Sequence, residues 1–137
     1  MFTTSGVEAA RERLAAADPD LPHAERWFAN VGVALLPVGR SWDAVRVDGP
    51  LANTVLSSGI AGPVIRDHDS MYFLVPSGTS AAWAVRGSAA LGPACYVAVP
   101  SPERTTGPGV HWAQAPDGSG ALVNAAALRL ALEGAAL

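Results

Sequence analysis

The chain has no lysine and a single cysteine among its 137 residues, and both shortages limit what it can be. All nine basic residues are arginine, and twelve acidic residues leave a net charge of −3. An extended nucleic-acid-binding surface needs clustered positive charge, so this balance excludes one. Cys95 alone cannot form an internal disulfide, which is typical of a protein from the reducing cytoplasm. Because Cys95 lies in an apolar strand pattern, we expect a buried and unreactive thiol.

Long hydrophobic runs and catalytic motifs are also missing. No window approaches the roughly 18 uninterrupted apolar residues of a membrane-spanning helix. The N-terminus has no basic segment followed by an apolar one, as a secretory signal would have. There is no nucleophile elbow, phosphate loop, dinucleotide fingerprint, paired-cysteine zinc spacing or HExxH helix. We therefore expect a cytoplasmic protein with no membrane contact and no cofactor.

What the chain does have is apolar residues, which make up half of it. Only 15% of the residues are charged, so a packed core is expected and disorder is not. The length fits one domain over residues 1–137, without internal repeats. The exclusive use of arginine, together with abundant alanine and glycine, indicates a GC-rich coding background such as that of actinobacteria.

Local patterns predict an α+β fold, with a small, mostly antiparallel sheet of roughly four or five strands flanked by helices. The stretch 91–112 is the richest in pattern, with 94–99 as the expected central strand and 110–115 as its returning partner. Hydrophobic periodicity predicts helices at residues 5–17, 23–30, 51–58 and 121–137, a helical turn at 80–85, and strands at 33–38 and 42–47. A hairpin is expected from strands 62–65 and 70–75 around the polar turn 66–69.

The densest polar cluster is Asp67, His68 and Asp69. Carboxylates and imidazole suit divalent metals, but aspartate is also favoured in turns because it bonds its own backbone. We favour a solvated hairpin turn, with these residues only as weak metal candidates. Asp43 and Asp48 lie an odd number of positions apart on a strand and so face opposite sides. We expect Asp43 at a charged strand start and Asp48 at a helix cap.

Aromatic residues and His111 raise two further alternatives. His111 is either a general base or a hydrogen-bonded structural residue, and we favour the structural role. Trp27, Trp42, Trp83 and Trp112 either stack on nucleic-acid bases or pack in the core. Arginine is not interleaved with them densely enough to favour stacking, so core packing is expected.

The order of segments resembles the N-terminal domain of bifunctional DNA primase/polymerases, a branch of the archaeo-eukaryotic primase superfamily. Residues 24–38 match a helix, a glycine and an apolar run that ends in proline. Met71-Tyr72-Phe73 with Pro76 is similar to that family's histidine strand, and residues 96–112 share a pattern of tyrosine, valines, proline, serine, glycine and tryptophan. The resemblance implies a shortened primase/polymerase-like core over residues 24–115. Residues 1–23 then form a helical N-terminal extension, and residues 118–137 the C-terminal helix.

The departures from that family bear on function. Its metal-binding strand carries two acids separated by one apolar residue, where this chain has Arg46-Val47-Asp48. Its histidine falls on Ser70, and its third acid falls near Ala89. Two-metal nucleotidyl transfer needs carboxylates to hold the cations, so the resemblance implies no catalytic residue and no bound metal. It implies instead a binding surface over Arg46, Asp48, His68 and Ser70, where a nucleotide phosphate or a partner's carboxylate binds.

Three functional hypotheses follow. The first is a stand-alone, degenerate primase/polymerase-like domain that acts as a regulatory or interaction module, binding a nucleotide, DNA or a protein partner. The second is a metal-dependent nucleotidyl transferase or nuclease with a reduced active site around Asp48, Asp67, His68 and Asp69. The third is a structural domain that forms a homodimer through its C-terminal helix.

Overall fold

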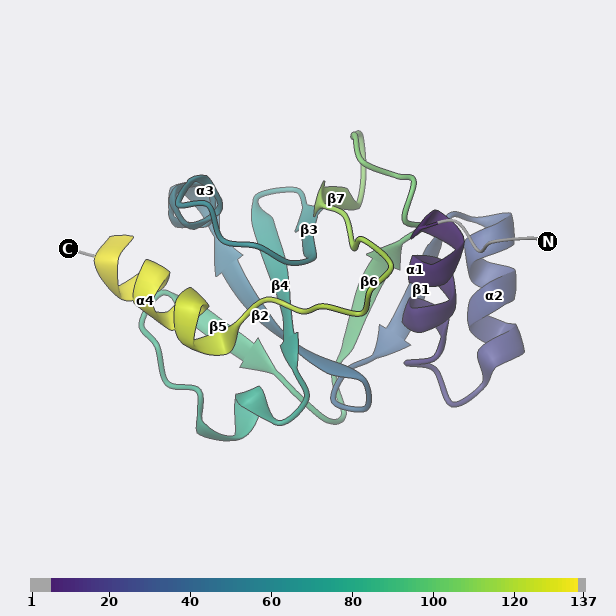
Figure 1. Ribbon diagram of the computed structural model, residues 1–137, viewed down its shortest axis with the longest axis horizontal. Helices are drawn as coiled ribbons and strands as arrows, with labels where there is room; N and C mark the ends of the chain where they lie inside the picture. Colours follow the sequence, from purple (N-terminus) through teal and green to yellow (C-terminus); the bar gives the residue numbers. More distant parts are fainter. Residues whose placement is uncertain (1–5, 136–137) are drawn as a thin grey trace.

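The computed structural model describes residues 6–135, which form two antiparallel sheets with helices packed around them (Figure 1). The larger sheet has the strand order β5–β2–β4–β3–β7, and every neighbouring pair in it is antiparallel. These strands are β2 (Trp42–Asp48), β3 (Val64–Asp67), β4 (Ser70–Pro76), β5 (Ser88–Leu91) and β7 (His111–Gln114). The predicted α+β fold is confirmed.

A split β-α-β unit forms the middle of the larger sheet. The helix α3 (Gly49–Ser57) connects β2 to β3, and β4 lies between these two strands. Since β2 and β3 are both antiparallel to β4, they run parallel to each other, as in ferredoxin-like folds. A short 3-10 helix, η1 (Thr79–Ala82), follows β4 and leads towards β5, which completes the other edge of β2. It replaces the helical turn expected at 80–85.

One face of the larger sheet is covered by α3 and by α4 (Ala125–Ala135), which contact each other at one end of the molecule (Figure 1). Successive side chains of a strand point to opposite faces, so Val45 and Val47 of β2 and Phe73 of β4 share this side. All three are fully buried in one cluster with Leu128 and Leu132 of α4. This cluster is the first of two cores.

The opposite face of the larger sheet is covered over only part of its length. The covering elements are the two-stranded sheet of β1 (Val33–Pro37) and β6 (Tyr96–Pro100), together with α1 (Gly6–Ala15) and α2 (Leu21–Asn30). They bury Ala44, Leu74 and Trp112 in the second core. Further along the same face of β2, Arg46 and Asp48 are exposed. This uncovered end of the sheet carries the candidate site.

Three of the predicted helices correspond to α1, α2 and α3, with small shifts at their ends. The helix α2 begins before residue 23 because Asp20 caps it, accepting a hydrogen bond at Oδ1 from the backbone N–H of His23 (3.3 Å). Ser5, the expected cap of α1, lies outside the described residues. Leu14 and Ala15 of α1 pack into the second core, so this helix docks on the domain.

The C-terminal helix begins later than the predicted residue 121. The backbone N–H of Val123 donates to the carbonyl oxygen of Leu74 (2.8 Å), which keeps the preceding segment extended alongside β4. Asn124 then accepts a hydrogen bond at Oδ1 from the backbone N–H of Ala127 (2.9 Å), as a capping residue does. Residues 136–137, where the predicted helix ends, lie outside the described residues. None of the helices within residues 6–135 is long and apolar enough to cross a membrane.

The central position predicted for strand 94–99 is wrong. The corresponding strand β6 pairs with β1 in the smaller sheet, and β7 pairs with β3 of the larger sheet rather than with β6. Cys95 is half-buried rather than buried, since it precedes this short strand. The true centre of the fold is the β2–β4 pair, which has neighbours on both sides.

The predicted hairpin is confirmed, but its turn is shorter than expected. Arg66 and Asp67 belong to β3 and Ser70 to β4, so His68 and Asp69 alone form the turn. The strand β5 was not predicted, because Ser88-Ala89-Ala90-Leu91 contains none of the β-branched or aromatic residues that favour strands.

Candidate functional site

Three side chains form one hydrogen-bonded cluster at the uncovered end of the larger sheet. Arg46 and Asp48 lie two residues apart on β2 and so share a face. The guanidinium of Arg46 donates from Nε to Oδ1 of Asp48 (3.0 Å) and from Nη2 to Oδ2 (3.3 Å). Ser70, the neighbour of Asp48 on β4, donates from Oγ to the same Oδ1 (2.6 Å). The structure therefore joins three of the four residues predicted for the binding surface.

The carboxylate of Asp48 serves this cluster and not the adjacent helix. Asp48 holds the N-cap position of α3, but its side chain makes no hydrogen bond to the first turn. The predicted helix-cap position of Asp48 is therefore confirmed, although its side chain does not bond the helix. The paired hydrogen bonds from Arg46, in which both partners are charged, hold the carboxylate over the sheet instead.

Hydrogen bonding fixes the charge state of the cluster. The hydroxyl of Ser70 and the guanidinium of Arg46 lower the pKa of Asp48, and the hydrogen bonds to Asp48 raise the pKa of Arg46. The Arg46 and Asp48 side chains remain 48% and 60% exposed, so water screens their attraction. The ion pair therefore contributes little to the stability of the fold, and its main effect is to occupy both oxygens of Asp48.

We expect the stability difference between wild type and Asp48→Asn to shrink in acid. A carboxylate whose pKa is lower in the folded state stabilises the fold above its unfolded pKa of about 3.9, and this stabilisation is lost as the pH falls through the folded pKa. The wild type should therefore be the more stable protein near pH 7, and the difference should shrink as the pH falls below about 3.9. Urea unfolding across this range measures the difference. A stability difference that grows as the pH falls would contradict the hydrogen bonding of Asp48 described above.

His68 lies apart from the cluster. It is the first residue of the hairpin turn, has a left-handed backbone with φ of 55°, and its side chain is 88% exposed. Its Nε2 atom is 3.8 Å from Oδ1 of Asp67. Within residues 6–135, no three side chains of His, Cys, Asp or Glu come close enough together to hold a metal ion. His68 and Asp69 thus form the solvated turn that the sequence favours, and Asp67 ends β3.

A shallow, open depression adjoins the cluster along the edge strand β5. Its lining consists of Arg46, Asp48, Gly87, Ser88 and Ala89. Ala89 is the register neighbour of Arg46 on β5. Gly87 has φ of 86°, and a Cβ there would lie 2.7 Å from Leu51 Cδ2, so the turn into β5 requires glycine. Sequence reasoning missed Gly87 and Ser88, and this glycine is the local signal that points to them.

The tryptophans divide between core and surface. Trp42 and Trp112 are 4% and 1% exposed and belong to the second core, while Trp83 packs against the first. Trp27 is 45% exposed on α2, where its Nε1 atom donates to Nε2 of His23 (2.9 Å). The expectation of core packing is therefore wrong for Trp27.

His111 has the structural setting expected for it. Its Nδ1 atom lies 2.9 Å from the carbonyl oxygen of Gly109, and the residue is half-buried in β7. Arg66 of β3 is its neighbour in the sheet. A histidine hydrogen-bonded to its own loop in this way orients the chain that enters β7.

Comparison of the chain with protein-family models, with curated proteins and with solved structures finds no match.

Proposed function

We propose that this chain is a non-catalytic, primase/polymerase-like binding domain whose uncovered sheet face takes the phosphate group of a nucleotide or a short single strand. One observation carries the proposal. The resemblance assigns that family's metal-binding acids and histidine to residues 46, 48, 70 and 89, and these residues lie on three adjacent strands. Asp48 is the neighbour of Ser70, and Arg46 is the neighbour of Ala89. Positions distant in the sequence thus converge as such a site requires.

The side chains at these positions favour an anion over a cation. Arg46 occupies both oxygens of Asp48, and its positive charge repels a divalent ion that approaches the same carboxylate. The guanidinium keeps N–H groups that Asp48 does not use, and its planar fork suits the paired oxygens of a phosphate. Ser70 lies beside this position on β4, as the register neighbour of Asp48. In this proposal Arg46 supplies the charge that a metal ion supplies in an active polymerase.

Tyr72 offers the aromatic surface that a nucleic-acid base needs. It is the neighbour of Arg46 on β4, on the same face, and is half-buried. Bases stack on aromatic side chains beside cationic groups in proteins that bind single strands. The negative net charge of the chain and the nearby carboxylate of Asp67 disfavour the binding of a long nucleic-acid strand, because it is a polyanion. We therefore favour a nucleotide or a short oligomer as the ligand, and a regulatory or interaction role for the domain. The alternative ligand of Arg46 is a carboxylate group of a partner protein.

One observation favours a metal-dependent nucleotidyl transferase or nuclease as a second candidate. Asp48 and Asp67 are both register neighbours of Ser70, so the two carboxylates flank it on one face. They are two strand spacings apart, roughly 10 Å, whereas metal–oxygen bonds measure about 2.0–2.6 Å. A shared ion thus requires Arg46 to release Asp48 and the hairpin to fold over. Metal dependence of ligand binding separates this candidate from the first.

A structural homodimer through α4 is the third candidate. Leu128 and Leu132 are buried within the domain, whereas Leu130 on the outer side of α4 is 70% exposed. This leucine would be the centre of such an interface. A molecular mass in solution that rises with protein concentration, and that Leu130→Glu holds at the monomer value, would support it.

Replacing Arg46 by glutamine is expected to weaken binding of dATP in the presence of EDTA by about tenfold or more, because a hydrogen-bonded charge on the phosphate is lost. Isothermal titration calorimetry measures the affinity. Arg129→Gln is the matched control, since Arg129 also donates from Nε to an exposed carboxylate, that of Glu133, at 3.0 Å. The control should bind as the wild type does. Equal affinities of the two variants would contradict the assignment of Arg46.

A further inference from the structure

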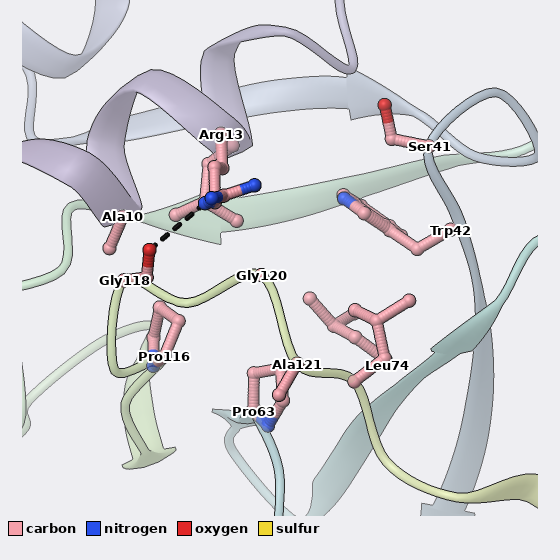
Figure 2. A pocket seen from close by; sticks show the side chains of 12 residues that line it. Ala10, Arg13, Ser41, Trp42, Pro63, Leu74, Pro116, Gly118, Gly120 and Ala121 are labelled. Carbon is pink, nitrogen blue, oxygen red and sulfur yellow. Dashed lines mark hydrogen bonds between the residues drawn. The ribbon is translucent and has the colours of Figure 1, made fainter.

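A partly enclosed cavity of about 160 Å³ lies at the other end of β2 (Figure 2). It opens between α1, the start of β2 and the segment that links β7 to α4, which crosses the middle of the molecule (Figure 1). The lining is mostly apolar and includes Ala10, Leu14, Pro63, Leu74, Ala121 and Leu122. Trp42, which also lines it, is about 20 Å along the strand from Asp48. The cavity is therefore separate from the cluster around Arg46.

Trp42 brings an unused hydrogen-bond donor to this cavity. Its side chain is 4% exposed, and its Nε1 atom has no hydrogen-bond partner among the described residues. The indole nitrogens of Trp27, Trp83 and Trp112 all donate hydrogen bonds. A buried donor without an acceptor is costly and uncommon. An acceptor bound in the cavity would satisfy it.

Arg13 brings a positive charge to the same space. Its Nε atom donates to the carbonyl oxygen of Gly118 (2.9 Å), which holds the guanidinium at the edge of the cavity. Its terminal nitrogens make no hydrogen bond to residues 6–135, and Figure 2 shows the guanidinium and the Trp42 indole nitrogen facing the same space. A Cβ on Gly120 would lie 2.8 Å from Nη1, so glycine at this position leaves room for the guanidinium.

The nearby carboxylate of Asp117 forms no hydrogen bond with Arg13 or Trp42 within residues 6–135. Its Oδ1 atom accepts hydrogen bonds from the backbone N–H (2.8 Å) and the hydroxyl (2.6 Å) of Ser119. Those bonds, with the charge of Arg13 as a lesser cause, lower the pKa of Asp117. The terminal nitrogens of Arg13 therefore remain available to another anion.

We propose that this cavity binds a small organic carboxylate, whose oxygens accept hydrogen bonds from Arg13 and Trp42 and whose apolar body contacts the aliphatic lining. A single exposed guanidinium beside an apolar lining suits a monoanion that carries a hydrocarbon part. The volume is close to that of an apolar cavity of about 150 Å³ that holds benzene in another protein. A ligand of the size of benzoate therefore fits.

Sodium benzoate is the probe, and the indole N–H signals of the full chain in a proton–nitrogen correlation spectrum are the readout. Benzoate should shift the indole signal that Trp42→Phe removes, with a dissociation constant between roughly 10 µM and 1 mM for a ligand of this size. Benzyl alcohol has the same ring without the charge and should bind at least about tenfold more weakly. No shift of that signal at about 10 mM benzoate, or equal binding of the alcohol, would overturn the proposal.

Arg13→Gln tests the charge without changing the buried tryptophan. Benzoate affinity should fall by about tenfold, because a charged donor becomes a neutral one. Arg11→Gln is the matched control on the same helix, since Arg11 pairs with Glu103 at 3.0 Å and does not line the cavity. Unchanged benzoate affinity in Arg13→Gln would overturn the proposal, and it would do so whatever the uncovered sheet face binds.

Discussion

Replacing Trp112 by alanine is expected to lower the free energy of unfolding by about 3–5 kcal/mol, the range for large aromatic residues in a core. Trp112 is 1% exposed and is one of the largest fully buried side chains. Its Nε1 atom donates to the carbonyl oxygens of Pro100 (3.0 Å) and Ser101 (3.1 Å). It thus ties β7 of the larger sheet to the end of β6 in the smaller one. Urea denaturation measures the loss.

Two control variants separate packing from hydrogen bonding at this position. Trp112→Phe keeps an aromatic ring but removes the donor, so we expect a smaller loss of about 1–3 kcal/mol. Trp27→Ala removes a tryptophan that is 45% exposed, and its cost should stay below about 1 kcal/mol. An unfolding free energy for Trp112→Ala as high as that of Trp27→Ala would mean that Trp112 does not hold the two sheets together.

The second large effect is expected at Asp43, which is fully buried. Its Oδ2 atom accepts hydrogen bonds from the backbone N–H groups of Gly78 (3.1 Å) and Ser80 (2.8 Å), which fix the loop that enters η1. Asp43→Ala leaves both donors without their acceptor, and each such loss costs about 1–3 kcal/mol. We expect the free energy of unfolding to fall by about 2–4 kcal/mol in urea denaturation.

Asp43→Asn is the matched control for the charge. An asparagine keeps one oxygen for the two N–H groups, and its NH₂ group replaces Oδ1, which has no partner among the described residues. The buried charge is removed at the same time, which offsets part of any loss. We therefore expect a change within about 1 kcal/mol. If Asp43→Ala and Asp43→Asn had equal free energies of unfolding, the hydrogen bonds from Gly78 and Ser80 would not contribute to stability.

Most helices and strands could be predicted because their signals lie in neighbouring residues. The alternation within residues 42–47 and the turn chemistry around His68 are local, and both elements are present. Strand pairing depends on distant partners. Val97 and Val99 have the pattern of a buried strand, but Tyr96 beside them is 60% exposed because the two-stranded sheet is covered on one side only.

Asp43 illustrates the same limit for single residues. The sequence predicts Asp43 only as a charged residue at the start of a strand, and the structure shows that its side chain is fully buried. The carboxylate is buried because the backbone of residues 78–80, far away in the sequence, folds over it. No local pattern in residues 42–47 carries this information.

The two candidate sites differ in how well they could be predicted from the sequence. Arg46, Asp48 and Ser70 were predicted from a family resemblance, and they form one hydrogen-bonded cluster. The cavity was not predicted, because Arg13 and Trp42 come from separate segments without a shared motif. An arginine on a helix and a tryptophan in a strand are ordinary residues until the fold brings them to one space.

The most direct test of the proposed function is the metal dependence of nucleotide binding, measured as the thermal shift of the wild-type protein with dATP in EDTA and with dATP and Mn²⁺. A ligand of the native state raises its stability, by about 2.7 kcal/mol at a concentration a hundredfold above the dissociation constant. We predict that dATP raises the melting temperature by several degrees in EDTA, that Mn²⁺ adds nothing to the shift, and that Arg46→Gln reduces the shift to about half or less. A shift that appears only when Mn²⁺ and dATP are present together would contradict a metal-free binding domain and favour the enzyme.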